Sequence, residues 1–478
     1  MQPMAVCRAG RLGRGRIGEL TRWLLVAAVV QTAVAVGLAS VPGPPQTEWN
    51  LDSTVDFLRM HGWQDSWRPM SRALAHVRSD SDRGVYEAVL LAEDPAKRQK
   101  FQYPPTSLLL IEPLAWLGGA DPRRAEGAET IRNLGNVLGW ISVLGSMLLG
   151  MAMLDRSLAL WGGAGRDGRP GRSELLVRGV CVLVLGLSFG PLMRSFAAGQ
   201  IQAWLTFWML LAMLLWLHGR RAGAGVLIGL CAVVKPPVGL VLIWALARGQ
   251  MRFVVGAGTT GAVLGLAGVL LYGWGHHADY VRAILLMSGG EAYYLNHSVN
   301  GVLLRLLGDA EDAFTFDRTA FGEPFAWVVW STRAVVAAGL VGLVVLGRAG
   351  RRREGREGRF AEGGEAHAPG FCAGLLLCTL LSPIAWDHHY GLAFGGLILG
   401  LAAVDAGLLS RSGRWWLLAS LVLMGNYLGF VNGLLWHTRW AAFLSGYVWL
   451  GGLILLVLLW RADAALVGRG TGHAGSPR

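Results

Sequence analysis

Long apolar runs separated by short polar links make up most of the chain. A helix needs about 17 to 25 predominantly apolar residues to cross a bilayer. Runs of this length are Trp23–Val41, Leu175–Met193, Ile201–Leu217, Phe253–Tyr272, Phe325–Leu346, Leu392–Leu409, Trp415–Val431 and Ala441–Trp460. A soluble core of this size would not need so many uninterrupted apolar segments. The pattern therefore predicts an all-α integral membrane protein, a polytopic bundle of about 10–13 membrane helices.

Two proline-bearing segments differ from the other apolar runs. The first reads YPPTSLLLIEPLAWLGG (103–119) and the second reads AGVLIGLCAVVKPPVGLVLIWALARG (224–249). Proline lacks an amide hydrogen and breaks a helix, and broken helices at membrane depth are tolerated where they line a cavity. We expect both segments to enter the membrane and return to the side from which they came.

The charge pattern favours this re-entrant arrangement. The chain has 43 Lys and Arg against 31 Asp and Glu, a net charge of +12. The basic residues gather in short links at 8–22, 166–178, 218–221, 348–359, 411–414 and 461–469. If both proline segments return, every Arg-rich link from 153 onward faces the cytoplasm, as the positive-inside rule requires. This distribution is typical of a membrane protein, and we expect no nucleic-acid partner.

The expected organisation is a basic cytoplasmic N-terminus (1–19), one transmembrane domain (20–461) and a cytoplasmic tail (462–478). We expect the first helix to remain as a signal anchor. The long outer loop that follows (42–103) contains LDSTVDFLRMHGW and RPMSRALAHVR, two amphipathic segments expected to lie on membrane lipids. The predicted location is the plasma membrane, with the polar chemistry on the outer face.

Motifs for nucleotides and metals lack the context they need. GRGRIG (13–18) lies in an Arg-rich tail and GAGTTG (256–261) lies inside an apolar run, so neither follows a strand as a dinucleotide site requires. DSD (80–82) imitates the metal-binding motif of enzymes that use nucleotide sugars, but a solvated turn is expected in an outer loop. None of the five cysteines suggests a disulfide framework. We expect no cofactor and no bound metal.

Acidic residues follow the first helix in the outer loop, at Glu48, Asp52, Asp56 and Asp65. Such residues are ordinarily solvated, but one carboxylate near the membrane can serve as a general base for a hydroxyl. Asp52 and Asp56 are four residues apart and share a face if this segment is helical.

Lys235 interrupts an apolar stretch directly before two prolines. A charged side chain at membrane depth is costly and usually functional. One interpretation is that it snorkels from a helix end to a lipid headgroup. The other is that it meets an anionic lipid-phosphate group inside the broken helix.

Two polar motifs are expected at the outer ends of membrane helices, NHSVNG (296–301) and SPIAWDHHY (382–390). Adjacent histidines point in different directions on a helix and no further ligand set stands out, so a phosphate-binding role is favoured over a metal site for His388 and His389. Asp387 is a candidate N-cap of the helix that follows.

Five motifs in this order resemble glycosyltransferase family 87. They are FQYPPTSLLLIEPLAWL, FAAGQIQAWLTFWMLLA, GLCAVVKPPVGLVLIWAL, NHSVNGVLLRLL and LSPIAWDHHYGL, and the resemblance runs from around residue 50 to residue 410. The family belongs to the GT-C class of integral-membrane transferases, which includes mannosyltransferases that use polyprenyl-phosphate-mannose.

The resemblance implies roles for particular residues. The catalytic acid of the family is an Asp in the first outer loop, followed by an aromatic or aliphatic residue and then a Tyr. Asp56-Phe57 matches the first part, but Arg59-Met60 stand where the Tyr is expected, so Asp52 stays an alternative. The KP and DHH motifs imply donor-phosphate binding by Lys235, His388 and His389. The further sugar or acceptor contacts we expect are Gln200, Asn300, Tyr103 and Asp387.

The predicted function is a membrane glycosyltransferase that moves a sugar, expected to be mannose, from a polyprenyl-phosphate donor to a hydroxyl of a lipid or glycan acceptor. An Asp base activates the hydroxyl, and positive groups stabilise the leaving phosphate in one inverting displacement. A transporter or lipid flippase is the alternative, since broken helices also suit transport, but the two halves show no internal repeat. A polymerase or ligase that uses a diphosphate lipid is a third interpretation.

Overall fold

The computed structural model describes residues 50–79, 83–92, 99–161, 171–287, 290–307, 325–356, 367–425, 428 and 444–471. Several expectations therefore lie outside the described residues: the N-terminus 1–19, the first helix, the DSD motif and the end of the tail. The described residues contain no strand, only one isolated bridge between Asn296 and Trp386. The expected all-α architecture is confirmed.

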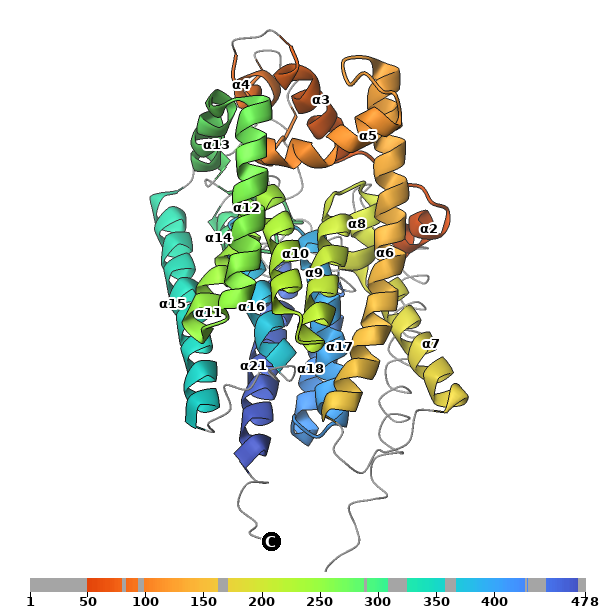
Figure 1. Cartoon of the computed structure of the whole chain (residues 1–478), viewed down its shortest axis with the longest axis vertical. Coiled ribbons are helices and arrows are strands. Elements are labelled where there is room, and N and C mark those ends of the chain that lie inside the picture. The colour runs from red at the N-terminus through yellow and green to blue at the C-terminus, as the bar shows by residue number, and fades with distance from the viewer. Residues whose placement is uncertain are drawn as a thin grey trace, which may run out of the picture.

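Most helices of the outer loop, of the first proline segment and of the later polar region gather at one end of the molecule, while the first described helix of the loop lies lower, beside the bundle (Figure 1). The two amphipathic segments of the loop are helical, as expected. These helices are α2 (Asn50–Leu58), α3 (Trp67–Val77), α4 (Val85–Val89), the 3₁₀-helix η2 (Pro105–Leu110), α5 (Glu112–Leu117) and α13 (Trp274–Met287).

The remaining helices form the bundle. They are α6 (Ala125–Trp161), α7 (Arg172–Ser188), α8 (Gly190–Ala197), α9 (Gln202–Leu217), α10 (Arg221–Val234), η3 (Pro236–Leu240), α11 (Val241–Arg248), α12 (Met251–Tyr272), α14 (Val299–Leu307), α15 (Ala326–Arg356), α16 (Ala368–Leu380), η5 (Asp387–Leu392), α17 (Ala393–Asp405), α18 (Arg411–Met424) and α21 (Tyr447–Thr471). Among the described residues, four helices are long and apolar enough to cross a membrane, or five if the bent pair α7–α8 is one span. Shorter apolar helices pack between them.

The second proline segment returns as predicted. Helix α10 ends at Val234, η3 begins at Pro236, and α11 runs back beside α15. A helical carbonyl normally accepts a bond from the amide four residues later, so Pro237 deprives the carbonyl of Val233 of its donor. The hydroxyl of Thr106, from the first proline segment, donates to that carbonyl at 2.5 Å. The two proline segments therefore stabilise each other.

The run Leu175–Met193 was expected to cross the membrane as a helix, and in the structure it forms a bent pair, α7 and α8, that together is long and apolar enough to cross. The chain bends by 60° between α7 and α8. Pro191 has no amide hydrogen for the carbonyl of Leu187, and the hydroxyl of Thr54 in α2 donates to that carbonyl instead, at 2.8 Å. The bend brings α8 under the outer loop, where it packs against both α2 and η5.

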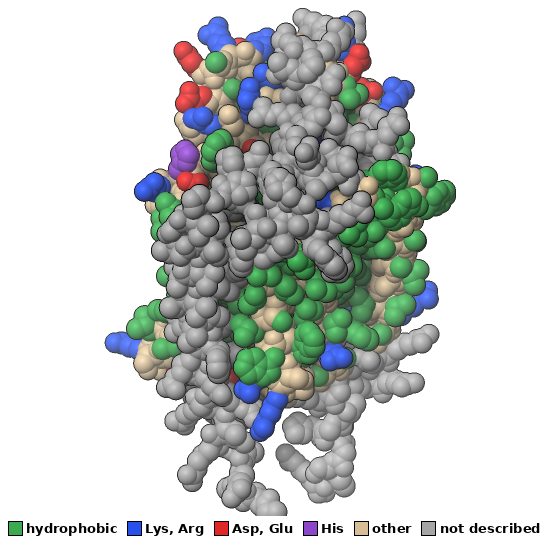
Figure 2. Space-filling model, turned by 180° about the vertical axis from the view of Figure 1, so that it is seen from behind, with side chains coloured by type: hydrophobic (Ala, Val, Ile, Leu, Met, Phe, Trp, Pro, Cys, Tyr) green, Lys and Arg blue, Asp and Glu red, His purple; other side chains and the backbone are tan. Residues whose placement is uncertain are grey.

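The Arg-bearing links that the structure describes lie at one end of the bundle. Helix α6 runs from the end that carries the outer loop to the opposite end, where α7 and α18 begin and where α15 and α21 end (Figure 1). An apolar band separates the two charged ends of the molecule in Figure 2, with mixed charges above it and mainly Lys and Arg below. This arrangement agrees with the re-entrant topology that the charge pattern favours.

Candidate active site

A cavity of about 940 Å³ opens beneath the outer loop. Its walls come from the outer loop, the end of α8 and the residues after it, the break after α10, helix α13, the segment 293–295, and the segment 382–389 that leads into η5. The polar residues that line it include Asp52, Asp56, Gln64, Asp65, Arg68, Lys100, Tyr103, Arg194, Gln200, Gln202, Lys235, His388 and His389. The structure thus brings together most of the residues that the sequence singled out.

The segment that carries the two histidines is held in place by the NHSVNG motif. The amide oxygen of Asn296 accepts the backbone N–H of Ala385 at 2.9 Å. The hydroxyl of Ser298 donates to the carbonyl of Pro383 at 2.7 Å. Both Asn296 and Ser298 are fully buried. This motif is therefore a scaffold for the histidine segment, and it does not line the cavity.

Asn300 and Asp387, two of the expected sugar or acceptor contacts, are not among the residues that line the cavity. Asn300 is buried and donates to the hydroxyl of Thr332 at 3.2 Å. Asp387 is buried and its Oδ2 lies 3.2 Å from Nε of Arg194. It is the first residue of η5, and Trp386 occupies the N-cap position expected for it.

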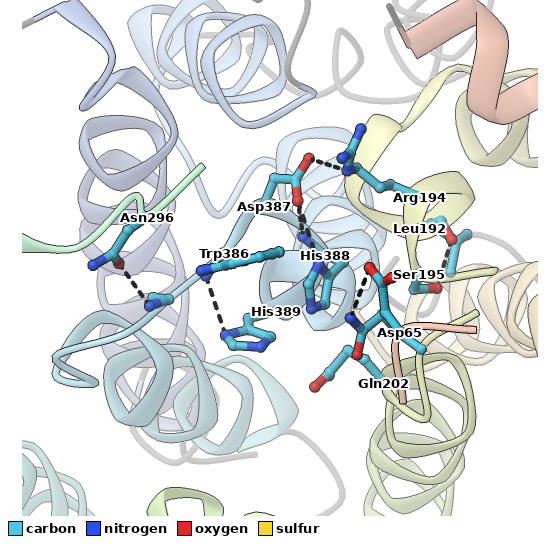
Figure 3. A network of polar contacts seen from close by, with 12 residues as sticks. Asp65, Leu192, Arg194, Ser195, Gln202, Asn296, Trp386, Asp387, His388 and His389 are labelled. Carbon is cyan, nitrogen blue, oxygen red and sulfur yellow. Dashed lines mark hydrogen bonds and ion pairs between the residues drawn. The ribbon is translucent and has the colours of Figure 1, made fainter. Parts of the chain in front are cut away.

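Asp387 instead positions the residues around it (Figure 3). Its Oδ1 accepts the backbone N–H of His388 at 2.7 Å and lies 3.4 Å from the His388 ring nitrogen Nδ1. The ring of His389 is fixed differently, because its Nδ1 accepts the backbone N–H of Trp386 at 3.2 Å. A neutral imidazole that accepts at Nδ1 carries its proton on Nε2. His389 therefore has an N–H donor on the nitrogen that does not bond to Trp386.

Lys235 lies at the break between α10 and η3, beside this histidine pair. Its ammonium donates to Oε1 of Gln202 at 3.0 Å. It is also close enough to interact electrostatically with His388 and His389. Lys235 and the adjacent pair His388 and His389, from two distant parts of the sequence, thus line one cavity, and nitrogen-bearing side chains of this kind suit an anionic group.

The acids of the outer loop lie on another wall of the same cavity. Asp52 and Asp56 share one side of α2, as their spacing predicts, and both line the cavity. Asp52 is exposed. Asp56 is half-buried, and its carboxylate lies 3.4 Å from Nδ1 of His61. Among the described residues, neither carboxylate is hydrogen-bonded or ion-paired with Lys235, His388 or His389.

Asp65 belongs to a strap of the outer loop, residues 63–66, that is bonded to the end of α8. Backbone amides of Trp63, Asp65 and Ser66 donate to the carbonyls of residues 197, 198 and 199 at 2.8, 3.1 and 3.1 Å. Gly199 permits the close approach, because it has a φ of +65° and a Cβ there would lie 2.1 Å from the Trp63 carbonyl oxygen. The backbone of Asp65 is therefore fixed while its carboxylate stays exposed to the cavity.

Gln200 and Tyr103, the two remaining expected contacts, surround this strap. The hydroxyl of Ser66 donates to Oε1 of Gln200 at 2.7 Å and lies 2.9 Å from the Tyr103 hydroxyl. The Nε2 of Gln200 lies 3.5 Å from Oδ2 of Asp65. Burial raises the pKa of Tyr103 to about 12, so its phenol remains protonated at neutral pH. Both residues line the cavity as predicted, and both also orient the strap.

Sequence reasoning missed Arg194 and Gln202 and did not separate Asp65 from the other acids. Arg194 stands in an apolar run, and an arginine there is itself a signal of a buried charge pair. Gln202 differs from Gln200 only in its position, and nothing local marks it as the partner of Lys235.

The described part of the chain contains no group of three or more His, Cys, Asp or Glu side chains that could hold a metal ion. The GAGTTG motif lies within the continuous helix α12. Because a phosphate-binding glycine loop must precede a helix, this motif is not a nucleotide site.

The comparisons with known proteins agree with the resemblance. The sequence model of glycosyltransferase family 87 matches residues 101–321. The match spans Tyr103, Gln200, Lys235 and Asn300. No curated protein and no solved structure matches the chain. Together with the apolar helices, this match indicates a multi-pass membrane glycosyltransferase.

Proposed function

We propose that this glycosyltransferase moves a sugar, mannose, from a polyprenyl-phosphate donor to a hydroxyl of a lipid or glycan acceptor at the outer face of the plasma membrane. The observation that carries the proposal is that two sets of side chains line one cavity. Lys235, His388 and His389, here called the nitrogen-rich wall, line it together with the outer-loop carboxylates of Asp52, Asp56 and Asp65, here called the carboxylate wall.

The nitrogen-rich wall suits the leaving phosphate. As the bond between the sugar and the phosphate breaks, negative charge grows on the phosphate oxygens. Donors that are already held in place stabilise that charge without reorganising, and this lowers the barrier. The Asp387–Arg194 pair and the Nδ1 bond of His389 hold the histidine segment in this way.

The carboxylate wall suits the acceptor. A base must take the proton of the hydroxyl as it attacks the anomeric carbon from the side opposite the phosphate, which gives inversion. Asp56 and Asp52 are the bases expected from the sequence. The geometry favours Asp65, because its backbone is strapped to the end of α8 and its carboxylate lies beside Gln200. No metal or nucleotide takes part in this scheme.

The deciding experiment measures transfer from radiolabelled polyprenyl-phosphate-mannose to a lipid-extract acceptor pool in membranes that contain the protein. Asp65→Asn is expected to lower transfer by about 10²–10⁴-fold, the usual contribution of a general base. Asp56→Asn and Asp52→Asn are the matched controls and are expected to change it by less than about fivefold. If Asp56→Asn or Asp52→Asn loses most of its transfer activity while Asp65→Asn stays active, the general base is the corresponding residue of α2 and not Asp65.

Further outcomes separate the alternative functions. Transfer from a diphosphate lipid, with none from any monophosphate lipid, identifies a polymerase or ligase. Absence of transfer together with lipid or substrate flux in liposomes identifies a transporter.

The proposed side of the membrane has its own test. In a variant without the natural cysteines, a membrane-impermeant maleimide added to intact cells is expected to label Trp116→Cys and to leave Arg220→Cys unlabelled. Both positions are exposed, Trp116 at the cavity end of the molecule and Arg220 in the link between α9 and α10. The opposite labelling pattern contradicts an outer active site.

A further inference from the structure

The indole N–H of Trp386 is held by a hydrogen bond, and the residue lines the cavity. The indole N–H donates to Oε2 of Glu291 at 3.0 Å. The ring is half-buried, lines the cavity, and lies between the ring of Tyr293 (centroids 5.7 Å apart) and the ring of His388 (5.8 Å). An indole held at its N–H can present only its apolar surface to a ligand.

Glu291 connects this ring to the outer loop. Its carboxylate is buried, with 6% of the side chain exposed, and its Oε1 accepts the ammonium of Lys100 at 2.5 Å. Lys100 is the residue just before the family match begins, and it is only 11% exposed. A carboxylate that is buried against a cation and also accepts an indole N–H has little freedom to move. Lys100 and Glu291 therefore fix the orientation of Trp386.

The position of Trp386 suits a sugar ring. His388 and His389 follow it within three residues, and Figure 3 shows His388, His389 and Trp386 side by side. In a polyprenyl-phosphate sugar, the ring is bonded directly to the phosphate. If the histidines hold the phosphate, the sugar must lie within one ring diameter of them. The C–H faces of a sugar are weakly positive and are attracted to the negative face of an aromatic ring.

We propose that Trp386 is the platform on which the sugar ring of the donor stacks, and that Glu291 and Lys100 are positioning residues that hold it. This inference rests on the proposed function and adds a sugar subsite to it. The phosphate wall then binds any lipid monophosphate, whereas Trp386 distinguishes a lipid that carries a sugar from one that does not.

The test compares two probes on purified full-length protein in nanodiscs, polyprenyl phosphate and polyprenyl-phosphate-mannose, by equilibrium binding. Trp386→Ala is expected to weaken binding of the mannosylated lipid by about tenfold and binding of the bare lipid by less than about twofold. Trp116→Ala is the matched control, because this tryptophan is 80% exposed and does not line the cavity. It is expected to change neither affinity.

The role of Glu291 is tested by epistasis. Trp386→Phe keeps an aromatic face but has no N–H for Glu291, so part of the preference for the mannosylated lipid is expected to remain. Glu291→Gln is expected to reduce that preference about threefold in the wild type and to have no further effect in the Trp386→Phe background. If Glu291→Gln reduces the preference for the mannosylated lipid equally in the wild type and in Trp386→Phe, Glu291 does not act through the indole N–H.

Each remaining outcome decides the proposal. Equal weakening of both lipids by Trp386→Ala shows that the ring only supports the wall and overturns the sugar platform. No weakening of either lipid overturns it as well. A variant that still binds the lipid without a sugar is folded, so this binding serves as the folding control. Wild-type protein that binds neither lipid overturns the proposed function and the sugar subsite together, whereas failure of the subsite alone leaves transfer in wild-type membranes intact.

Discussion

Two proline breaks, α7–α8 and α10–η3, frame the cavity and are built in the same way. In each, a proline removes the amide that would pair with the carbonyl four residues earlier. In each, a threonine hydroxyl from the outer region replaces that amide, Thr54 for Leu187 and Thr106 for Val233. Breaking a helix at membrane depth is tolerated because its carbonyls are satisfied again.

The two breaks differ in the basic residue that each places beside the cavity. Arg194, in the last turn of α8, lies 3.2 Å from the buried carboxylate of Asp387. Lys235, at the end of α10, donates to the neutral amide of Gln202. Among the described residues, no carboxylate forms an ion pair with Lys235. Arg194 is thus paired with a carboxylate, whereas Lys235 is bonded to a neutral amide. Under the proposed function, the charge of Lys235 serves the anionic donor.

The largest expected effect tests this difference at Lys235. We expect Lys235→Met to reduce kcat/KM for transfer by about 10²–10³-fold, the usual cost of removing one stabilising donor from a reacting centre. Thermal stability in detergent should stay the same or rise, because a half-buried ammonium is replaced by an apolar chain of similar length. Lys235→Arg keeps the charge and should recover part of the activity. A drop in stability without a loss of transfer would assign Lys235 a structural role.

At the other break, Asp387→Asn is expected to cost about 3 kcal/mol of stability, since it leaves a buried guanidinium without its carboxylate. The measurement is the midpoint of thermal unfolding in detergent, followed by size-exclusion chromatography. The double variant Asp387→Asn/Arg194→Gln should recover much of the loss, because it removes both members of the pair. Losses that simply add in the double variant would show that the pair does not act as a unit.

The strap that contains Asp65 is bonded to residues 197–199, at the end of α8. The substitution Gly199→Ala should displace this strap. Alanine at a φ of +65° costs about 1–2 kcal/mol, and its Cβ would in addition lie 2.1 Å from the carbonyl oxygen of Trp63. We expect lower stability and a fall in transfer. Gly119→Ala is the control, with a φ of +55° and open space around the Cβ. It carries the same backbone strain and should leave transfer unchanged. Equal transfer in the two variants would contradict a catalytic role for the strap.

The sequence predicted one break and missed the other for a physical reason. Lys235-Pro236-Pro237 combines a charge with two prolines, and the combination cannot continue a membrane helix. Pro191 is a single proline in an apolar run, and such prolines are often accommodated without a change of direction. The bend at Pro191 depends on Thr54, because its hydroxyl donates to the carbonyl of Leu187 that lost its amide partner. The two residues are 133 positions apart, so the contact could not be predicted from the local sequence.

The same limit applies to the candidate site. Lys235 could be chosen from sequence because it stands out against apolar neighbours, and His388 and His389 could be chosen because they form a polar cluster between two apolar runs. Asp65 could not be separated from Asp56, because the bonds of its strap to residues 197–199 join distant segments. The contact of Asn300 could not be predicted for the converse reason, since its polar neighbours in the sequence do not show that its side chain bonds to Thr332.

The smallest expected effect tests the similarity between the two breaks. Thr106→Val and Thr54→Val keep the shape of the side chain but remove the donor to Val233 and Leu187, so each should cost about 1–2 kcal/mol for an unsatisfied carbonyl. Thr260→Val is the matched control, because Thr260 donates to the carbonyl of Gly256 within the unbroken helix α12. That carbonyl keeps its backbone partner, and stability should not fall. If Thr106→Val and Thr54→Val are as harmless as Thr260→Val, the breaks do not depend on their threonines. If only Thr106→Val lowers transfer as well, the α10 break is the one whose geometry the reaction requires, since it alone places Lys235.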